Sequence, residues 1–208
     1  MVLEYASGLR KSLKMKFSRV AIALPLVVAM MLPATSQAYP PGQNIAVSLT
    51  SAGMVKPGTV LTANVTKAKP GAVTITWGTT NATVQSITGT AASTFKPTKT
   101  GVYKVTVLDT ATTGNTTSAF LYVPSVTFPK KPTSIKSTAT FTVRNAKPGT
   151  VVTIKIGSKS FKGTVKGTAG KTNKLDIKLK LPKKGSNTVS VSVGTDKKLV
   201  FSGKAVGK

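Results

Sequence analysis

Short runs of alternating apolar and polar residues follow one another along almost the whole chain after residue 38. A period of two places successive side chains on opposite faces of a strand, and the 3.6-residue period of an amphipathic helix is nearly absent. Thr, Val and Ser dominate these runs, while Gly and Pro separate them. Because these residue types favour strands and turns, the pattern predicts an all-β protein.

The alternating runs fall into two groups of seven expected strands. The first group lies at residues 45–49, 60–65, 73–77, 83–87, 92–95, 102–108 and 118–123. The second lies at residues 126–128, 139–144, 152–156, 160–165, 175–181, 188–193 and 199–202. Seven short strands with turn residues between them are typical of a two-sheet sandwich.

One stretch of the sequence occurs twice. Thr59–Gly71 and Ser137–Gly149 align without a gap, and both end in Ala-Lys-Pro-Gly. So long a period indicates two copies of a small domain, because solenoid repeats recur every 20–50 residues or so. We therefore expect two tandem domains, residues 39–124 and 125–208, joined by a short and stiff connection at 124–132 that contains three prolines.

The first 38 residues have the features of a secretory signal peptide. A basic start precedes an apolar run at 20–32, and Ser36-Gln37-Ala38 forms a small-x-small cleavage site. Met15 is an alternative start to Met1. A membrane anchor is the rival interpretation, but the run is shorter than the roughly 20 residues that a spanning helix needs. We expect cleavage after Ala38 and a secreted, extracellular or cell-wall-associated chain without an integral membrane segment.

The chain contains no Cys and no His, and its four acids are Glu4, Asp109, Asp176 and Asp196. Disulfides and the commonest zinc ligands are thereby excluded, and three isolated Asp residues do not form a calcium cage. General acid–base catalysis uses His or paired carboxylates, and no Ser–Lys or Thr–Lys spacing singles out a nucleophile. We expect no catalytic activity, no metal, no cofactor and no small-molecule substrate.

Two features of the first half resemble a known family. Trp77 is the single Trp and lies on the third expected strand, and Gly101-Val102-Tyr103-Lys104-Val105 resembles a tyrosine corner. The first half is similar to bacterial immunoglobulin-like and PKD-like domains. The resemblance implies two tandem immunoglobulin-like β-sandwich domains after the signal peptide, with a role in adhesion, spacing or ligand presentation outside the cell. It implies no catalytic residues.

The second half departs from this family pattern. Asn187 stands where Tyr103 stands, and Ile156 stands where Trp77 stands if one inserted residue is allowed. Both hallmarks are therefore expected to be lost in the second half. The sandwich predicted there rests on the repeat.

Positive charge is concentrated in the second half. The formal net charge is +26, and +22 remains after removal of residues 1–38. Residues 39–124 carry +5, whereas residues 125–208 carry +17, from 19 basic and two acidic side chains. Alternation with apolar residues places many of these lysines on outward positions. The candidate polyanion-binding residues are Lys155, Lys162, Lys166, Lys178, Lys180, Lys183 and Lys184.

Three interpretations of this charge stay open. Outward lysines keep a β protein soluble and block pairing at sheet edges, so the chain is on one reading a spacer module in a larger surface assembly. An unbalanced positive field also binds polyanions. We expect a non-catalytic surface adhesion or structural protein whose second domain contacts anionic envelope polymers, with other surface proteins as further partners. The third interpretation is a general binder of extracellular nucleic acid or acidic glycans.

Overall fold

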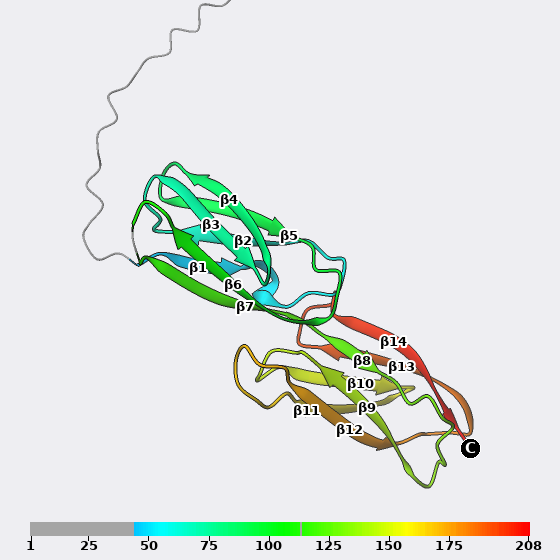
Figure 1. Cartoon of the computed structure of the whole chain (residues 1–208). Coiled ribbons are helices and arrows are strands. Elements are labelled where there is room, and N and C mark those ends of the chain that lie inside the picture. The colour runs from blue at the N-terminus through cyan, green and yellow to red at the C-terminus, as the bar shows by residue number, and fades with distance from the viewer. Residues whose placement is uncertain (1–43, 113) are drawn as a thin grey trace, which may run out of the picture. The chain divides into compact units, whose positions relative to one another are not determined.

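The computed structural model describes residues 44–112 and 114–208, where the chain is built almost entirely from antiparallel strands (Figure 1). The first seven strands are β1 (Ala46–Leu49), β2 (Leu61–Thr66), β3 (Gly71–Trp77), β4 (Thr80–Ser86), β5 (Thr90–Phe95), β6 (Gly101–Asp109) and β7 (Thr116–Val123), with a 3-10 turn η1 (Thr50–Gly53) after β1. The next seven are β8 (Ser125–Thr127), β9 (Thr138–Arg144), β10 (Val151–Ile156), β11 (Lys159–Thr164), β12 (Lys174–Lys180), β13 (Gly185–Val193) and β14 (Val200–Gly207). Each overlaps a run predicted from the alternation, so the all-β prediction is confirmed.

The two sets of strands have the same sheet topology. In the first, the order β1-β2-β5 forms one sheet and β4-β3-β6-β7 forms the other. In the second, β8-β9-β12 and β11-β10-β13-β14 take the corresponding places. Two immunoglobulin-like sandwiches in tandem are therefore confirmed as the fold class. We call β1–β7 the first sandwich and β8–β14 the second; a domain boundary at residue 124 stays a prediction.

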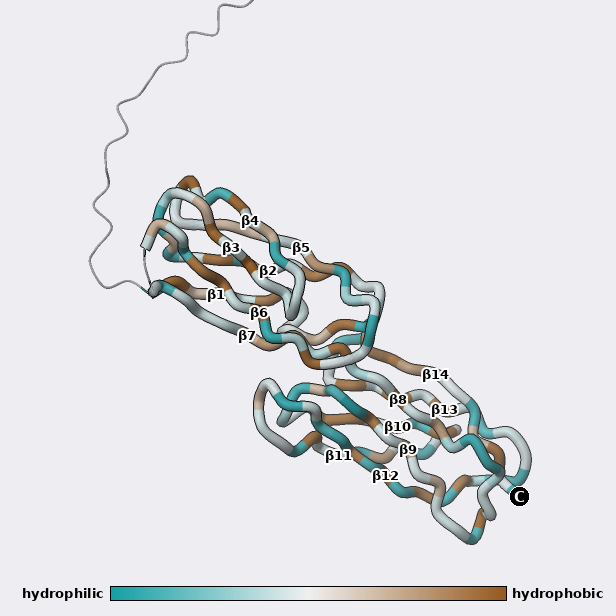
Figure 2. Tube along the Cα trace, in the orientation of Figure 1, coloured by the Kyte–Doolittle hydropathy of each residue, from teal (hydrophilic) through white to brown (hydrophobic). Residues whose placement is uncertain are grey.

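Hydrophobic residues recur along the strands of both sandwiches (Figure 2). Those that are buried form one hydrophobic core in each sandwich. In the first, Ala63 on β2, Ile75 on β3 and Val107 on β6 are completely buried. In the second, Phe141 on β9 and Ile154 on β10 are equally buried, and the same cluster includes residues of β12, β13 and β14. Inward residues of both sheets thus meet in one layer, and outward residues of the two sheets point in opposite directions.

The repeated stretch keeps its backbone geometry in both copies. Lys67 and Asn145 occupy equivalent places and both have left-handed φ values, 62° and 57°. Each is followed by a buried alanine, Ala68 or Ala146. A left-handed φ is uncommon for a residue with a side chain, so the two copies share an unusual conformation at this position.

The two family hallmarks are present in the first sandwich. Trp77 is 2% exposed, and its ring stacks on Phe95 with centroids 5.2 Å apart. The ring of Tyr103 meets Phe95 edge-on at 5.9 Å, and its hydroxyl donates a 2.9 Å hydrogen bond to the carbonyl of Lys99. This bond ties the loop before β6 to the strand, as a tyrosine corner does.

The expectation that the second sandwich loses both hallmarks is half wrong. Ile156 does replace the buried Trp at the end of β10 and is 1% exposed. Asn187, however, keeps the bond of the corner, because its Nδ2 donates to the carbonyl of Lys183 at 3.0 Å and to that of Gly185 at 3.1 Å. The side-chain amide of Asn187 therefore donates the hydrogen bond that the hydroxyl of Tyr103 donates in the first sandwich.

The last strand is longer than its sequence pattern predicts. The alternation indicates a strand at 199–202, but β14 continues to Gly207. Gly203 and Gly207 weaken the pattern because they carry no side chain. Both are needed for packing, since a Cβ at Gly203 would come within 2.8 Å of the Phe128 ring and one at Gly207 would overlap the carbonyl of Lys183.

The expected signal peptide lies outside the described residues. Within residues 44–112 and 114–208, no helix is long and apolar enough to cross a membrane.

Candidate polyanion interface

All seven candidate lysines are exposed, but they lie in four different regions of the second sandwich. Lys155 and Lys162 are on the four-stranded sheet, and Lys178 and Lys180 are on the three-stranded sheet. Lys183 and Lys184 lie in the loop between β12 and β13. Lys166 follows β11 beside the Lys-Pro-Gly turn, where the carbonyl of Val165 accepts a bond from Gly149. The seven residues therefore do not form one surface.

The outer face of the four-stranded sheet is rich in hydroxyl groups. Lys155 on β10 lies between Ser160 of β11 and Ser190 of β13. Lys162 lies opposite Thr153. Lys155 and Lys162 are thus flanked by Ser and Thr side chains, which makes this part of the face polar.

The outer face of the three-stranded sheet carries its lysines on the edge strand β12. Lys178 and Lys180 lie opposite Thr140 and Thr138 of β9. Arg144, the single arginine of residues 39–208, lies opposite Lys174 on the same face. Because this face points away from Lys155 and Lys162, one flat polyanion could not contact both groups at once.

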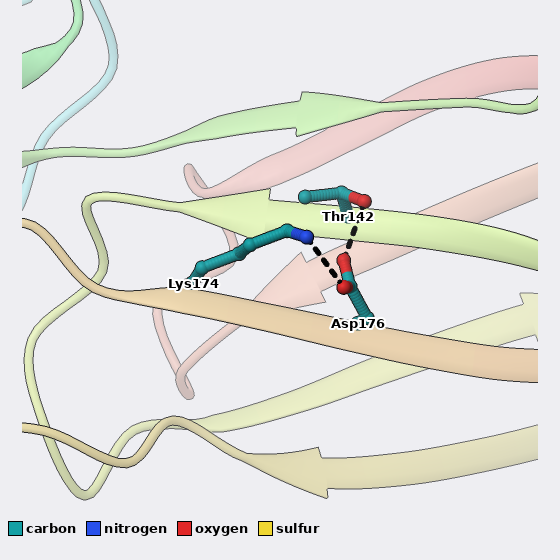
Figure 3. A network of polar contacts seen from close by, with 3 residues as sticks. All are labelled: Thr142, Lys174 and Asp176. Carbon is teal, nitrogen blue, oxygen red and sulfur yellow. Dashed lines mark hydrogen bonds and ion pairs between the residues drawn. The ribbon is translucent and has the colours of Figure 1, made fainter.

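Asp176 is the acid on this face, and it is already neutralised (Figure 3). Its carboxylate forms a 2.7 Å ion pair with Lys174 and accepts a 2.6 Å hydrogen bond from the hydroxyl of Thr142. The Lys174 ammonium, followed by the Thr142 hydroxyl, lowers the pKa of Asp176 below its ordinary value of 3.8. Its negative charge is therefore engaged within the sheet and competes little for the other lysines.

Five exposed lysines lie at the end of the second sandwich that carries the β8–β9, β10–β11 and β12–β13 connections. The backbone of Lys208, after β14, pairs with Thr133, and Asn187 ties the β12–β13 loop at Lys183. This end carries exposed lysines from the β8–β9 loop, the start of β11 and the β12–β13 loop. We call them the basic end: Lys131, Lys136, Lys159, Lys183 and Lys184.

Sequence reasoning found two members of the basic end and missed three. Lys131, Lys136 and Lys159 are 24 to 53 residues away from Lys183 or Lys184 along the chain, and no local pattern links them. The order of the strands could have identified these three lysines. In a sandwich of antiparallel strands alternate loops lie at the same end, so lysines in alternate loops converge.

The described residues hold no group of three His, Cys, Asp or Glu side chains that could bind a metal ion. Asp109 is buried in the first sandwich, where its carboxylate accepts 3.0 Å hydrogen bonds from the amides of Lys69 and Ala111. The Asp109 carboxylate thus stabilises the two turns that contain Lys69 and Ala111.

Comparison with protein-family models and with curated proteins gives no match. Among solved structures, the chain is similar to red sea bream transglutaminase (13% identity, 80% of this chain and 32% of that chain, TM-score 0.35). It is also similar to invasin, a bacterial integrin-binding protein (15%, 80% and 40%, 0.34). A third is the C-terminal fragment of intimin solved with the intimin-binding domain of its translocated receptor (15%, 79% and 64%, 0.39).

These likenesses are remote, and the chain spans between a third and two thirds of the length of these structures. They include a transglutaminase and two proteins that bind other proteins, so they do not select a function. The class that the geometry itself defines is a tandem immunoglobulin-like β-sandwich protein with a strongly basic second sandwich.

Proposed function

We propose that the protein is a secreted, non-catalytic adhesion or structural protein of the cell surface, and that its second sandwich contacts anionic polymers of the envelope. One observation carries the proposal. Residues 125–208 combine 19 basic with two acidic side chains, and one of those acids, Asp176, is paired with Lys174. Such an unbalanced field attracts polyanions strongly at low ionic strength.

The composition supports a non-catalytic role. General acid–base chemistry needs His or carboxylates with shifted pKa values, and residues 39–208 contain no His and three acids. Asp109 is committed to backbone amides, and Asp176 is committed to Lys174 and Thr142. A specific hydrolytic activity in the purified mature protein would contradict this part of the proposal.

A pull-down on isolated cell envelope, repeated at several salt concentrations, tests the polyanion contact. We expect the mature protein to bind at low salt and to be released as the salt concentration rises. A variant with all seven candidate lysines changed to Gln should lose most of this binding. The control is Lys96, Lys99 and Lys104 of the first sandwich changed to Gln, which should bind like wild type. Binding that ignores ionic strength would overturn the proposal.

A second function is favoured by the position of the lysines on strand edges. β11 and β12 are edge strands of their sheets, and they carry Lys159, Lys162, Lys174, Lys178 and Lys180. Lysines on edge strands prevent pairing with other chains. On this reading the charge keeps a spacer module soluble, and the lysine-to-Gln variant should aggregate more while binding to envelope stays unchanged.

A further inference from the structure

A groove of about 470 Å³ opens at the basic end, between the β10–β11 turn and the β12–β13 loop. Its lining residues include two lysines, Lys159 and Lys183, and three residues with hydroxyl groups, Ser158, Ser186 and Thr188. None of its nine lining residues is acidic, and none is aromatic. Such a donor set favours an anion and offers no ring on which a base could stack.

The loop that forms one wall of the groove is fixed in place. Asn187 is 2% exposed, and both hydrogens of its Nδ2 are used, one on the carbonyl of Lys183 and one on that of Gly185. Gly207 of β14 packs directly against the carbonyl of Lys183. The backbone that carries Lys183 and Lys184 is therefore held before any ligand arrives, which lowers the entropy cost of binding.

The two acids of the second sandwich lie away from the groove. Asp176 is in the middle of β12 and is paired with Lys174. Asp196 lies in the loop after Val193, beyond the far end of β13. Because β13 has nine residues, its two ends are about 26 Å apart, more than two Debye lengths at physiological salt. The positive field of the basic end is therefore opposed by no nearby acidic side chain of this sandwich.

We propose that the basic end is the main contact of the second sandwich with its polymer, and that the groove receives phosphate groups of a linear phosphate polymer. This inference rests on the proposed function and names its site and chemistry. Lys binds phosphate as a point charge, whereas planar carboxylates are matched by the fork of Arg. The single arginine nearby, Arg144, lies on β9 opposite Lys174 and does not line the groove.

Two triple variants of the full mature protein, matched in charge, test the site. One changes Lys159, Lys183 and Lys184 to Gln, and the other changes Lys155, Lys162 and Lys178 to Gln. The probe is inorganic polyphosphate, titrated at several salt concentrations. For the first variant we expect an affinity loss of about tenfold or more and a salt slope smaller by about two to three. For the second we expect a loss of less than about threefold.

Further experiments distinguish a wrong site, a wrong ligand chemistry and a wrong proposed function. Lys159, Lys183 and Lys184 changed to Arg keep the charge and should keep the affinity, whereas an equal loss in this variant would overturn the charge-based site. Equal losses in the two Gln variants, or a larger loss in the sheet-face variant, would overturn the basic end while leaving the proposed function standing. Envelope binding that survives hydrolysis of phosphodiester polymers would overturn the phosphate chemistry. A wild-type protein that binds neither envelope nor polyphosphate would overturn both proposals.

Discussion

Tyr103 and Asn187 occupy equivalent places in the two sandwiches, and each binds the backbone carbonyl of the residue four positions before it. The phenol hydroxyl of Tyr103 reaches Lys99 at 2.9 Å, and the amide of Asn187 reaches Lys183 at 3.0 Å. The corner is therefore a constraint on the loop, and the chemical identity of the donor is secondary. This relationship gives the first prediction.

Removal of the donor should cost more at the second corner than at the first. Tyr103→Phe removes one hydrogen bond that is partly accessible to water, so we expect a loss of about 1 kcal/mol in the free energy of unfolding. Asn187→Ala removes two bonds from a buried side chain, so we expect about 2–3 kcal/mol. Urea denaturation measures both, with Thr188→Ala as an exposed control. Equal losses at the two corners would contradict the role assigned to Asn187.

Asp109 and Asp176 should differ sharply when each is changed to Ala. Asp109→Ala removes a buried carboxylate that accepts hydrogen bonds from the amides of Lys69 and Ala111, and we expect a loss of about 3 kcal/mol. Asp176→Ala removes an exposed ion pair and should leave the stability almost unchanged. Thermal unfolding followed by circular dichroism measures the two changes. A small effect at Asp109 would mean that these amides find other acceptors.

The contribution of Asp176 should depend on pH in one direction. Its pKa is lower in the folded protein than its ordinary value of 3.8, so near that pH the unfolded chain binds more protons than the folded one. Stability from this group is therefore present above about pH 4 and is lost as the pH falls through the lowered pKa. An NMR titration of the carboxyl carbon should show the lowered pKa, and Lys174→Gln should raise it toward 3.8. An unchanged value in that variant would contradict the stated cause.

Trp77 should report on the core of the first sandwich. It is the single Trp and is stacked on Phe95 in a buried site, so unfolding should shift its fluorescence to longer wavelength. Trp77→Ala should cost about 3–5 kcal/mol because it leaves a cavity. Phe95→Leu, which keeps most of the volume but removes the stacked ring, should cost less. A cost for Trp77→Ala below about 1 kcal/mol would show that the stack is not part of the core.

Much of the fold could be predicted from the sequence because strand formation leaves a local pattern. The alternation around Ile177 identified both the strand and its inward face, and the repeat identified a second copy of the fold. The bond of Asn187 could not be predicted, because the sequence shows the residue but not how near the Lys183 carbonyl lies. The extension of β14 could not be predicted for a similar reason. Gly203 interrupts the alternating pattern, and only the structure shows that a side chain there would collide with the ring of Phe128.

The candidate site was predicted less well, because it depends on which loops meet. Lys178 and Lys162 look alike along the chain, yet the structure places them on opposite faces of the sandwich. Lys159 and Lys183 are distant in sequence, yet they line one groove. The number of lysines in the sequence gives the total positive charge of the second sandwich. Where that charge lies on the surface depends on the fold and could not be predicted.

The two corners also differ in what surrounds the side chain that forms them. In the first sandwich the ring of Tyr103 fills the space at its corner and packs edge-on against Phe95. In the second, the shorter side chain of Asn187 holds the loop without such a ring and forms part of the groove wall. The two corners therefore hold equivalent loops with side chains of different size, and in the second sandwich the side chain that holds the loop also lines a concave surface beside Lys159 and Lys183.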